Sequence, residues 1–551
     1  MRRATRLLAL ILAGCAQNDG ARGPVGGTLI VAAAADADVL IPSVVRTSQG
    51  RFASELLFDG LVMLGPSLNT VGDADFLPRL ARSWSWSSDS LTIEFALDPD
   101  ARWHDGAPVV AADVVRGLEV IREPINGSSL RVDLADVDSI AVRGTHRAAV
   151  HFSRRSAEQF YAMTLIFPLP AHLVQVDPAT PINVTPFARE PVGSGPFRFA
   201  SWQQQARLEL AAVPDHYRGR ARLDRVVLTV SPEPATGLAR VWAGEADVWE
   251  LLPAGDLDEA ARYPHVRVVT SRAFDYAYVA FNFQDARDRE RPHPLFRDRE
   301  LRRAISMAVD RPALVRAIFD SLALVAYGPF VRAQHTADTT LRQIAADSAR
   351  AAALLDSLGW RVDARDGVRR RNGQRLAFTA LIPGSSRNRE RASVLMQEQL
   401  RRLGIAMSIE RAENRVFTQK RVEGKFDVVF GGWLTTPSPR GVRGTWGSVS
   451  RGEGWGALND GRYSNAAFDD AVAQGLAVLD PVASRRHFRE AYQIILDDAA
   501  ALFLYEPRTN AAVHTRLQIP AWRSDGWWRA IEEWSVDPAQ RLPRDARPTT
   551  P

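Results

Sequence analysis

A histidine and an aspartate stand side by side in the stretch "ARWHDGAPVVAADVV", as His104 and Asp105. A histidine held by a carboxylate is a frequent general base, so acid–base catalysis is one interpretation of this stretch. Adjacency in the sequence does not by itself favour catalysis, because a general base also needs a bound substrate and an orienting third group within reach. A role in the scaffold is the alternative.

Other signatures of enzyme chemistry are weak in this sequence. It has no G-x-S-x-G nucleophile elbow and no H-E-x-x-H zinc motif, and "VGSGPF" does not fit the G-x-G-x-x-G pattern of dinucleotide-binding proteins. The ten histidines are dispersed, and a single cysteine cannot form a paired-cysteine metal site. We predict no catalytic residue, no bound metal and no cofactor, although one histidine could still contact a metal chelate in a binding cleft.

The first residues of the chain predict export. Arg2, Arg3 and Arg6 precede the apolar run "LLALILAG", which is too short to cross a bilayer as a helix and is typical of a secretory signal. The run ends in "LAGC", which resembles the lipobox of bacterial lipoproteins and predicts cleavage before Cys15 and lipidation of its thiol. An unmodified thiol in a discarded signal is the alternative. Residues 16–25 would then tether the mature protein to a membrane surface of the cell envelope.

Length and composition predict a globular protein of several parts. The chain has 551 residues, more than one hydrophobic core usually holds, so two or more lobes are expected. Hydrophobic residues make up 46% of the chain and charged residues 24%, which is typical of a folded protein. The net charge is +5, but the arginines are scattered without a long basic run, which argues against nucleic-acid binding. Disorder is expected in the tail, residues 539–551.

Strand and helix patterns alternate along the mature chain. Residues 91–97 ("LTIEFAL") alternate apolar and polar side chains with the period of a strand. Residues 390–405 place apolar side chains on one face of a helix that Gly404 would end, and Asp310 and Pro312 fit the cap and first turn of another helix. Further strands are expected at residues 26–35, 376–382, 406–410 and 426–432. This alternation predicts an α/β protein.

A series of motifs runs through nearly the whole mature chain. In order they are "LARSWSWSSDSLTIEFALDPDARWHDGAPVVAADVV", "EPVGSGPFRF", "YVAFNFQ", "HPLFRDRELRRAISMAVDR", "FDVVFGGW", "YSNAAFDD" and "ALFLYEP". The series resembles the extracellular solute-binding proteins of ABC importers that take peptides, nickel complexes or opines. The resemblance implies an α/β, two-lobed periplasmic-binding-protein fold with an inserted extra subdomain, in a monomer that is not an enzyme.

The resemblance also implies how the chain is divided. Hinge strands or their neighbours are expected near "PVGSGPF" and "FNFQ", where Gly193 and Gly195 would tolerate the backbone torsions that closure requires. A tight structural turn is the alternative role of the two glycines. Lobe I would comprise residues 26–70, 190–284 and 501–538, the inserted subdomain residues 71–189, and lobe II residues 285–500.

The same resemblance favours the scaffold interpretation of His104. In such proteins the segment is structural: Asp105 and Gly106 would form a turn, and the run that follows would lead into a helix whose start Asp113 helps to cap.

Ligand contacts are expected on two segments whose relatives line the cleft. Tyr278, Phe281 and Asn282 lie on the first, and strand alternation would put Tyr278 and Asn282 on one face and Phe281 on the other. Trp433 ends the second segment, and packing between the lobes is its alternative role. The loop after it adds four candidates: Thr435, Thr436, Arg440 and Arg443.

The loop after Trp433 departs from the peptide-binding relatives, which carry an aspartate there for the amino terminus of the peptide. This chain reads "GGWLTTPSPRGVRG", without an acid. Leaving a buried ammonium without its partner costs about 2–5 kcal/mol, so free dipeptides and tripeptides are doubtful ligands. A longer peptide gripped along its backbone, a sugar, or an anionic solute that meets Arg440 or Arg443 stays open.

Together these features predict a lipid-anchored solute-binding component of an ABC importer. It would capture a peptide or a related small solute between two closing lobes, outside the cytoplasmic membrane, and deliver it to a permease and its ATPase. Two alternatives are a polypeptide-binding chaperone or sensor on the same fold and a secreted hydrolase. Neighbouring permease and ATPase genes would favour transport, and turnover of peptides or esters would favour the hydrolase.

Overall fold

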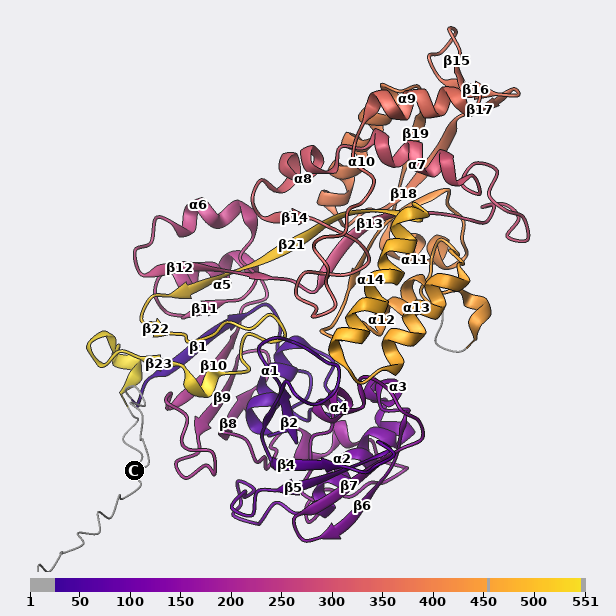
Figure 1. Ribbon diagram of the computed structural model, residues 1–551. Helices are drawn as coiled ribbons and strands as arrows, with labels where there is room; N and C mark the ends of the chain where they lie inside the picture. The colour runs from indigo at the N-terminus through magenta and orange to yellow at the C-terminus, as the bar shows by residue number, and fades with distance from the viewer. Residues whose placement is uncertain (1–24, 453–455, 547–551) are drawn as a thin grey trace, which may run out of the picture.

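The computed structural model describes residues 25–452 and 456–546 of the chain. The predicted signal, Cys15 and nearly all of the tether lie outside the described residues. The described chain is an α/β protein built on one large sheet of twelve strands and a separate sheet of four. In Figure 1 the large sheet runs from β19 and β18 at the upper right to β9 and β8 at the lower left, and the four-stranded sheet lies below it.

The first half of the large sheet combines stretches that are far apart in the sequence. β1 (Thr28–Ala33), the predicted first strand, pairs in parallel with β10 (Arg225–Val230) on one side and with β11 (Val248–Trp249) on the other. β9 (Arg207–Ala212) and β8 (Phe197–Gln203) continue the sheet in antiparallel fashion. β1 is almost entirely buried because it has a neighbouring strand on each side and packs into an apolar core.

The second half of the large sheet contains the three strands predicted around residues 376–432. β18 (Ala377–Pro383) lies between β19 (Ala406–Ala412) and β20 (Val428–Leu434) and is parallel to both. β13 (Asp275–Phe281) then pairs antiparallel with β20. This half has its own apolar core, which confirms the prediction of an α/β unit here.

Helices cover the second half where the sequence predicts them. α10 (Arg387–Arg401) links β18 to β19 and is followed by Gly404, whose φ of +74° suits a glycine after a helix end. α7 (Arg299–Ala308) precedes α8 (Arg311–Phe319). Asp310 caps α8 as predicted, because its carboxylate accepts a hydrogen bond from the backbone N–H of the third helical residue.

One long strand joins the two halves of the sheet. β21 (Ala501–His514) pairs with β13 near its start, and with β12 (Val266–Arg272) and β11 near its end. β12 leads directly into β13, so the chain crosses between the halves at residues 272–275 and again within β21. The hinges expected at or beside "PVGSGPF" and "FNFQ" stay a prediction, and β13, which ends where "FNFQ" begins, pairs with strands of the second half.

The glycines of "PVGSGPF" make a close backbone approach. A Cβ atom at Gly193 would lie 1.9 Å from the carbonyl oxygen of Leu57, and one at Gly195 would lie 2.4 Å from that of Leu56. Neither glycine has a φ in the left-handed region. Glycine is therefore needed at both positions because a Cβ atom would clash with the neighbouring backbone. This agrees with a structural role rather than with unusual torsions at a hinge.

His104 holds this glycine stretch in place. Its Nδ1 accepts a hydrogen bond from the backbone N–H of Gly193 at 3.1 Å, and its Nε2 lies 3.0 Å from the carbonyl oxygen of Gly195. The carboxylate of Asp105 points elsewhere, to Nε2 of His172 at 2.7 Å. Burial lowers the pKa of His104 to about 4, which suits a neutral ring that bridges backbone groups. The structure therefore agrees with the scaffold interpretation.

The neutral ring predicts a specific acid sensitivity. Because the pKa of His104 is lower in the fold than in the unfolded chain, its contribution to stability is complete above pH 6.5 and is lost as the pH falls toward 4. Acidification from pH 7 to pH 5 should cost the parent about 2 kcal/mol of unfolding free energy that a His104→Gln variant keeps. Urea denaturation at both pH values measures this difference, and an identical loss in parent and variant would contradict it.

The separate sheet forms the core of a subdomain. In the sequence its strands lie between β1 and β8 of the first half. β5 (Thr92–Leu97) lies between β4 (Ala81–Trp86) and β7 (Arg147–Phe152), and β7 also pairs with β6 (Val137–Gly144), all antiparallel. Side chains along β5 alternate between buried and half-buried, as its sequence predicts. α2 (Ala111–Arg122) packs on this sheet, and the carboxylate of its third residue accepts a hydrogen bond from the backbone N–H that precedes the helix.

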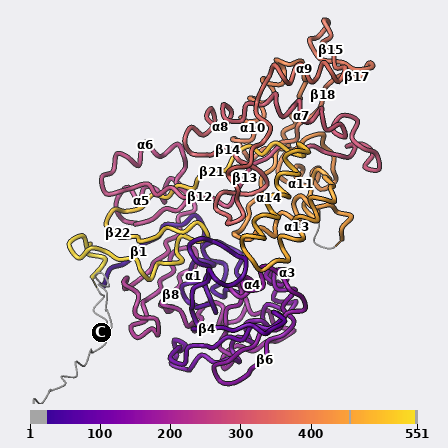
Figure 2. The backbone as a smooth tube through the Cα atoms, viewed as in Figure 1, coloured from indigo at the N-terminus to yellow at the C-terminus, as the bar shows by residue number. Residues whose placement is uncertain are grey.

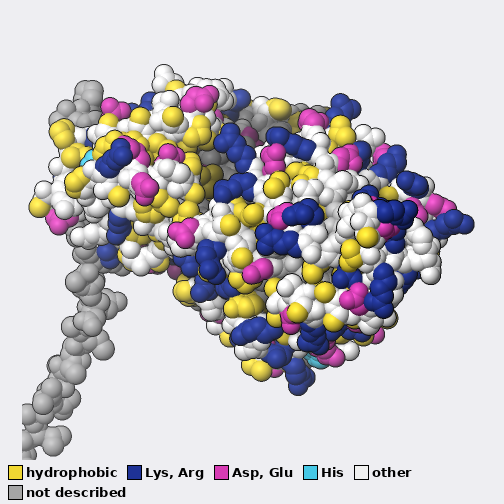
Figure 3. Space-filling model, turned by 90° about the horizontal axis from the view of Figure 1, so that it is seen from above, with side chains coloured by type: hydrophobic (Ala, Val, Ile, Leu, Met, Phe, Trp, Pro, Cys, Tyr) yellow, Lys and Arg dark blue, Asp and Glu magenta, His cyan; other side chains and the backbone are white. Residues whose placement is uncertain are grey.

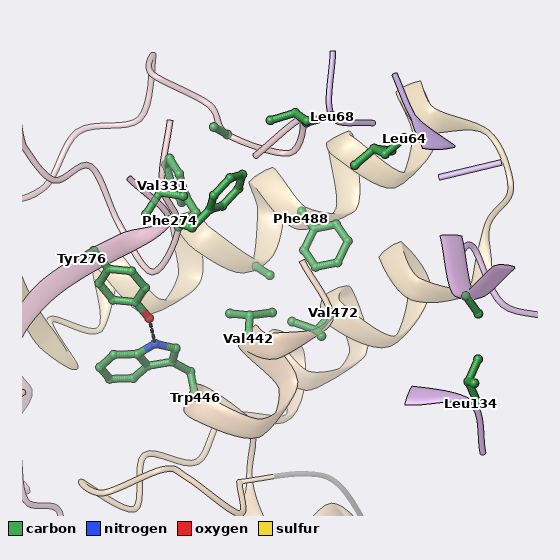
Figure 4. Packing of buried hydrophobic residues seen from close by; sticks show 14 of the residues in the cluster. Leu64, Leu68, Leu134, Phe274, Tyr276, Val331, Val442, Trp446, Val472 and Phe488 are labelled. Carbon is green, nitrogen blue, oxygen red and sulfur yellow. Dashed lines mark hydrogen bonds between the residues drawn. The ribbon is translucent and has the colours of Figure 1, made fainter. Parts of the chain in front are cut away.

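Three helices of the second half reach down to this subdomain. They are α12 (Gly441–Trp446), α13 (Ala466–Ala477) and α14 (Pro481–Asp497). Figure 4 shows Val442, Trp446, Val472 and Phe488 of these helices in one apolar cluster with Leu64, Leu68 and Leu134. A backbone hydrogen bond of 2.8 Å from the N–H of Ala157 to the carbonyl oxygen of Leu476 spans the same contact. The subdomain and the second half therefore touch directly.

A buried ion cluster anchors the C-terminal segment to β1. The guanidinium of Arg516 pairs with Asp247 at 2.7 Å and with Asp545 at 2.6 Å, and all three side chains are at most 1% exposed. Asp545 also accepts a hydrogen bond from the backbone N–H of Thr28 at 2.7 Å. The expectation of disorder from residue 539 onward is wrong for residues 539–546, because the cluster and the short helix that ends at Asp545 hold them in place.

The remaining elements are short and mostly connect the parts already described. Figure 2 shows how the indigo N-terminal and yellow C-terminal stretches run through the same region of the fold. The remaining helices and strands are α1 (Ser48–Leu57), α3 (Leu130–Asp133), α4 (Gln159–Ala162), α5 (Pro234–Trp242), α6 (Leu257–Ala260), α9 (Ser348–Ser357), α11 (Asn414–Val422), β2 (Val62–Leu64), β3 (Phe76–Pro78), β14 (Ala323–Val325), β15 (Arg361–Val362), β16 (Arg369–Arg371), β17 (Gln374–Arg375), β22 (Leu517–Gln518) and β23 (Ser535–Val536).

The surface carries mixed charge. Figure 3 shows basic and acidic side chains interspersed over the face seen from above, as the scattered arginines of the sequence predict. Among the described residues, none of the helices is long and apolar enough to cross a membrane.

Candidate functional site

A cavity of about 700 Å³ lies where the first half of the sheet, the subdomain and the loop after β20 meet. Three separate parts of the chain therefore enclose one space, in the manner of a ligand site between lobes. Residues on its wall include Arg46, Thr47, Arg51 and Glu55 from the first part, Leu130, Asp133, Glu158, Tyr161 and Leu165 from the second, and Thr436, Ser438, Arg440 and Arg443 from the third.

α1 forms the wall contributed by the first half. Its start is fixed by Thr47, whose hydroxyl accepts a hydrogen bond from the backbone N–H of Gly50 at 3.1 Å. Arg51 and Glu55 lie one turn apart on this helix and pair at 2.8 Å, and Arg529 approaches the same carboxylate at 3.2 Å. Burial raises the pKa of Glu55, but the two arginines outweigh it and the net shift is downward. Glu55 is therefore a charged acid that is already neutralised.

Glu158 connects the subdomain to the loop of the second half. Its carboxylate accepts hydrogen bonds from the hydroxyls of Thr70 at 2.6 Å and Ser438 at 2.7 Å, and Nε of Arg440 lies 3.5 Å away. Arg440 also donates to the hydroxyl of Ser156 at 3.2 Å. Burial raises the pKa of Glu158 even though Arg440 opposes the shift. The cavity is thus closed on one side by a polar contact between two parts of the protein.

Of the four residues predicted in the loop after Trp433, three line the cavity and one holds the loop in place. Thr436, Arg440 and Arg443 lie on the cavity wall. The hydroxyl of Thr435 donates instead to the carbonyl oxygen of Phe274 at 2.9 Å, which ties the loop to the crossing between β12 and β13. Ligand contact by these four residues stays a prediction, and Thr436, Arg440 and Arg443 are well placed for it.

Trp433 lies in an aromatic and cationic cluster beside β13. Its ring stacks on Tyr278 with a centroid distance of 6.2 Å, and the guanidinium of Arg421 lies 5.3 Å from its centroid. The hydroxyl of Tyr278 donates to Asp460 at 3.1 Å. Burial raises the pKa of Asp460 to about 6. The chain does bring an acid near this tryptophan, but Tyr278 and Arg421 already engage it.

The other two predicted residues of β13 and its end are buried in supporting positions. Phe281 packs in the core of the second half, on the face of β13 opposite Tyr278, so the predicted alternation of these two residues is confirmed. The side-chain amide of Asn282 donates to the carbonyl oxygens of Gly424 at 3.0 Å and Phe426 at 2.8 Å. Tyr278, Phe281, Asn282 and Trp433 are not part of the cavity wall, and a ligand role for them stays a prediction.

The walls from the first half and the subdomain could not be recognised in the sequence. Arg51 and Glu55 have the spacing of a helical ion pair, but nothing in that spacing says which space the helix faces. Asp133, Glu158 and Tyr161 carry no motif, and only the fold brings them opposite Arg440 and Arg443. Charge complementarity between distant stretches is the one signal that could have suggested the contact.

The cavity wall combines several kinds of side chain. Hydroxyls, paired carboxylates, guanidinium groups and apolar side chains line it, and none of the lining residues is a histidine. In the described ranges, no group of three or more histidine, cysteine, aspartate or glutamate side chains is arranged to hold a metal ion. The histidine that we considered as a contact for a metal chelate is therefore not found on this wall.

Comparison with known proteins shows the family to which the chain belongs. A family model described as bacterial extracellular solute-binding proteins, family 5, middle, matches residues 75–453. The oligopeptide-binding protein AppA of Bacillus subtilis is 25% identical over 83% of this chain and 82% of its own length. The probable D,D-dipeptide-binding periplasmic protein DdpA of Escherichia coli is 24% identical over 89% of this chain and 90% of its own.

Solved structures show the same fold. The ABC transporter substrate-binding protein CtaP from Listeria monocytogenes superimposes with a TM-score of 0.79 at 19% identity, covering 93% of this chain and 99% of that one. AppA from Bacillus subtilis in complex with a nonapeptide gives a TM-score of 0.69 at 23% identity, with the same coverage. Since the family model spans more than half of the 551 residues, the chain belongs to the bacterial extracellular solute-binding proteins of family 5.

Proposed function

We propose that this protein is the solute-binding component of an ABC importer, and that it captures peptides in the cavity between the first half of the sheet, the subdomain and the loop after β20. The observation that carries the proposal is that one cavity is enclosed by three parts of the chain, and that the described chain passes between the two halves of the sheet at β21 and at the link from β12 to β13. Few torsions need to change for such parts to open and close. A captured peptide would then be delivered to a membrane permease.

The names of the relatives support peptides as the solute class. AppA is described as an oligopeptide-binding protein and DdpA as a probable dipeptide-binding protein. The cavity, at about 700 Å³, has the size of sites that enclose small ligands. Its hydroxyls can meet peptide backbone groups, and its apolar side chains can meet peptide side chains.

Closure on binding tests this proposal. If peptide binds the closed arrangement better than an open one, it shifts the population toward closure, and the radius of gyration measured by small-angle X-ray scattering should fall. A peptide at a hundred times its Kd should also add about 2.7 kcal/mol to the unfolding free energy. Mixed-sequence peptides that change neither the scattering nor the thermal unfolding would contradict the proposal.

Anchoring is the second element of the proposal and rests on "LAGC". Lipidation of Cys15 would hold the exported protein at the cell envelope, near its permease. Replacement of Cys15 by Ser should release the protein from the membrane fraction. A variant that stays with the membrane to the same extent as the parent would refute the lipid anchor.

A further inference from the structure

The charged side chains of the cavity are not all equally available to a ligand. Four arginines and three acids line it. Arg51 is paired with Glu55, and Arg440 is paired with Glu158. These two ion pairs remove two arginines and two acids from the groups that a solute can engage at low cost.

Arg443 is different, because its guanidinium has no hydrogen bond or ion pair with any described residue. It lies on α12, one turn after Arg440, and is half-buried on the cavity wall. The helix backbone around it is held independently of the side chain: its carbonyl oxygen accepts hydrogen bonds from the N–H groups of Gly447 at 3.2 Å and Gly456 at 3.1 Å. The guanidinium is thus an unpaired donor on a fixed stretch of backbone at the cavity wall.

The surroundings of Arg443 make an anionic partner favourable. Burial and the neighbouring guanidinium of Arg440 lower the pKa of Arg443, which means that its charge is poorly compensated there. A carboxylate at this place would accept two parallel hydrogen bonds from the planar guanidinium and would cancel the repulsion from Arg440. A neutral solute offers neither effect.

The subdomain side of the cavity suits the rest of a peptide. Leu130, Tyr161, Leu165 and Phe167 supply apolar surface there. The third acid of the cavity, Asp133, makes no hydrogen bond or ion pair with a described side chain, and partial burial of its carboxyl group raises its pKa, which weakens its negative charge. An anionic group on the second-half side and apolar groups on the subdomain side therefore match the distribution of side chains.

We propose that Arg443 binds a carboxylate of the solute, so that the preferred peptides present a free C-terminal carboxylate, or an acidic side chain, to α12. This inference rests on the proposed peptide-binding function and adds the chemical class of ligand group that the cavity selects. Arg440 is not assigned a ligand contact, because its side chain already meets Glu158 at 3.5 Å and Ser156 at 3.2 Å, while its charge still acts on Arg443.

Two pentapeptide libraries of identical composition test this assignment, one with free and one with amidated C-termini. Affinity selection followed by mass spectrometry should show that the parent retains the free-acid peptides about ten- to a hundredfold better than the amides. Arg443→Gln should retain both libraries equally, and Arg443→Lys should keep part of the preference because it keeps the charge. Arg387 is an exposed arginine on α10 outside the cavity that pairs with no residue in the described ranges, so Arg387→Gln controls for net charge and should behave like the parent.

The outcomes separate the inference from the function on which it rests. If acidic side chains are enriched among the amidated peptides retained by the parent but not by Arg443→Gln, the side chain is the carboxylate that Arg443 reads. If the parent retains free-acid and amidated peptides equally, without enrichment of acidic residues, the inference is wrong while peptide binding stands. If the parent retains no peptide from either library, both the inference and the proposed function are overturned.

Discussion

Replacement of Gly441 by Trp is expected to abolish ligand binding without unfolding the protein. Gly441 is the first residue of α12, lies on the cavity wall and is exposed. A Cβ atom there would meet no other atom within 4 Å, and its φ is not in the left-handed region, so a side chain is tolerated by the backbone. The indole would occupy space that the solute needs. We expect the affinity for peptides to fall at least about a hundredfold, measured by calorimetry.

A second glycine provides the matched control for this variant. Gly255 is also exposed, would likewise leave a Cβ atom in open space, and does not line the cavity. Gly255→Trp should bind peptides as the parent does, and both variants should keep the unfolding free energy within about 0.5 kcal/mol. If Gly441→Trp folds normally and binds like the parent, the solute does not occupy this cavity.

The largest effect on stability is expected from Arg516. Its guanidinium neutralises Asp247 and Asp545 in a site without solvent, and its Nη2 donates to the carbonyl oxygen of Thr28 at 2.7 Å. Arg516→Met would leave two buried carboxylates with less positive charge, although Arg544 still reaches Asp247 at 2.7 Å. Breaking a buried pair in this way costs about 3–5 kcal/mol, so urea denaturation should show a loss of that size.

An exposed ion pair supplies the comparison for Arg516. Arg262 pairs with Glu259 at 2.7 Å, but its side chain is 74% exposed. Arg262→Met should change the unfolding free energy by less than about 1 kcal/mol. A loss below about 1 kcal/mol in Arg516→Met as well would mean that the C-terminal segment is not held by the buried cluster.

Much of the fold could be predicted from local patterns. β5 alternates because one face is buried, and α8 begins at Asp310 because a carboxylate satisfies free backbone N–H groups, so both signals are present in short stretches of sequence. The crossings between the two halves could not be predicted in this way. β13 and β21 are buried on both faces, and a continuous apolar strand does not show to which half of a sheet it belongs.

The candidate site was predicted only in part, for a physical reason. The loop after Trp433 shows its arginines in the sequence, but their availability depends on partners that the fold supplies from far away. Arg440 contacts Glu158, whereas the guanidinium of Arg443 has no hydrogen bond or ion pair within the described part of the chain, and neither fact follows from spacing along the chain. Conversely, the resemblance places Tyr278 and Asn282 on a segment that lines the cleft, but the hydrogen bonds of their side chains lie inside the protein.

Native mass spectrometry tests most directly whether this protein holds a peptide in the cavity between its parts. The protein is measured first as purified, and then after denaturation, removal of small molecules and refolding in the presence of mixed-sequence peptides. We predict a complex of one protein with one peptide, lost on denaturation, regained on refolding and absent in Gly441→Trp. A refolded protein that takes up no peptide of any length, or that binds peptide equally well in Gly441→Trp, would contradict this prediction.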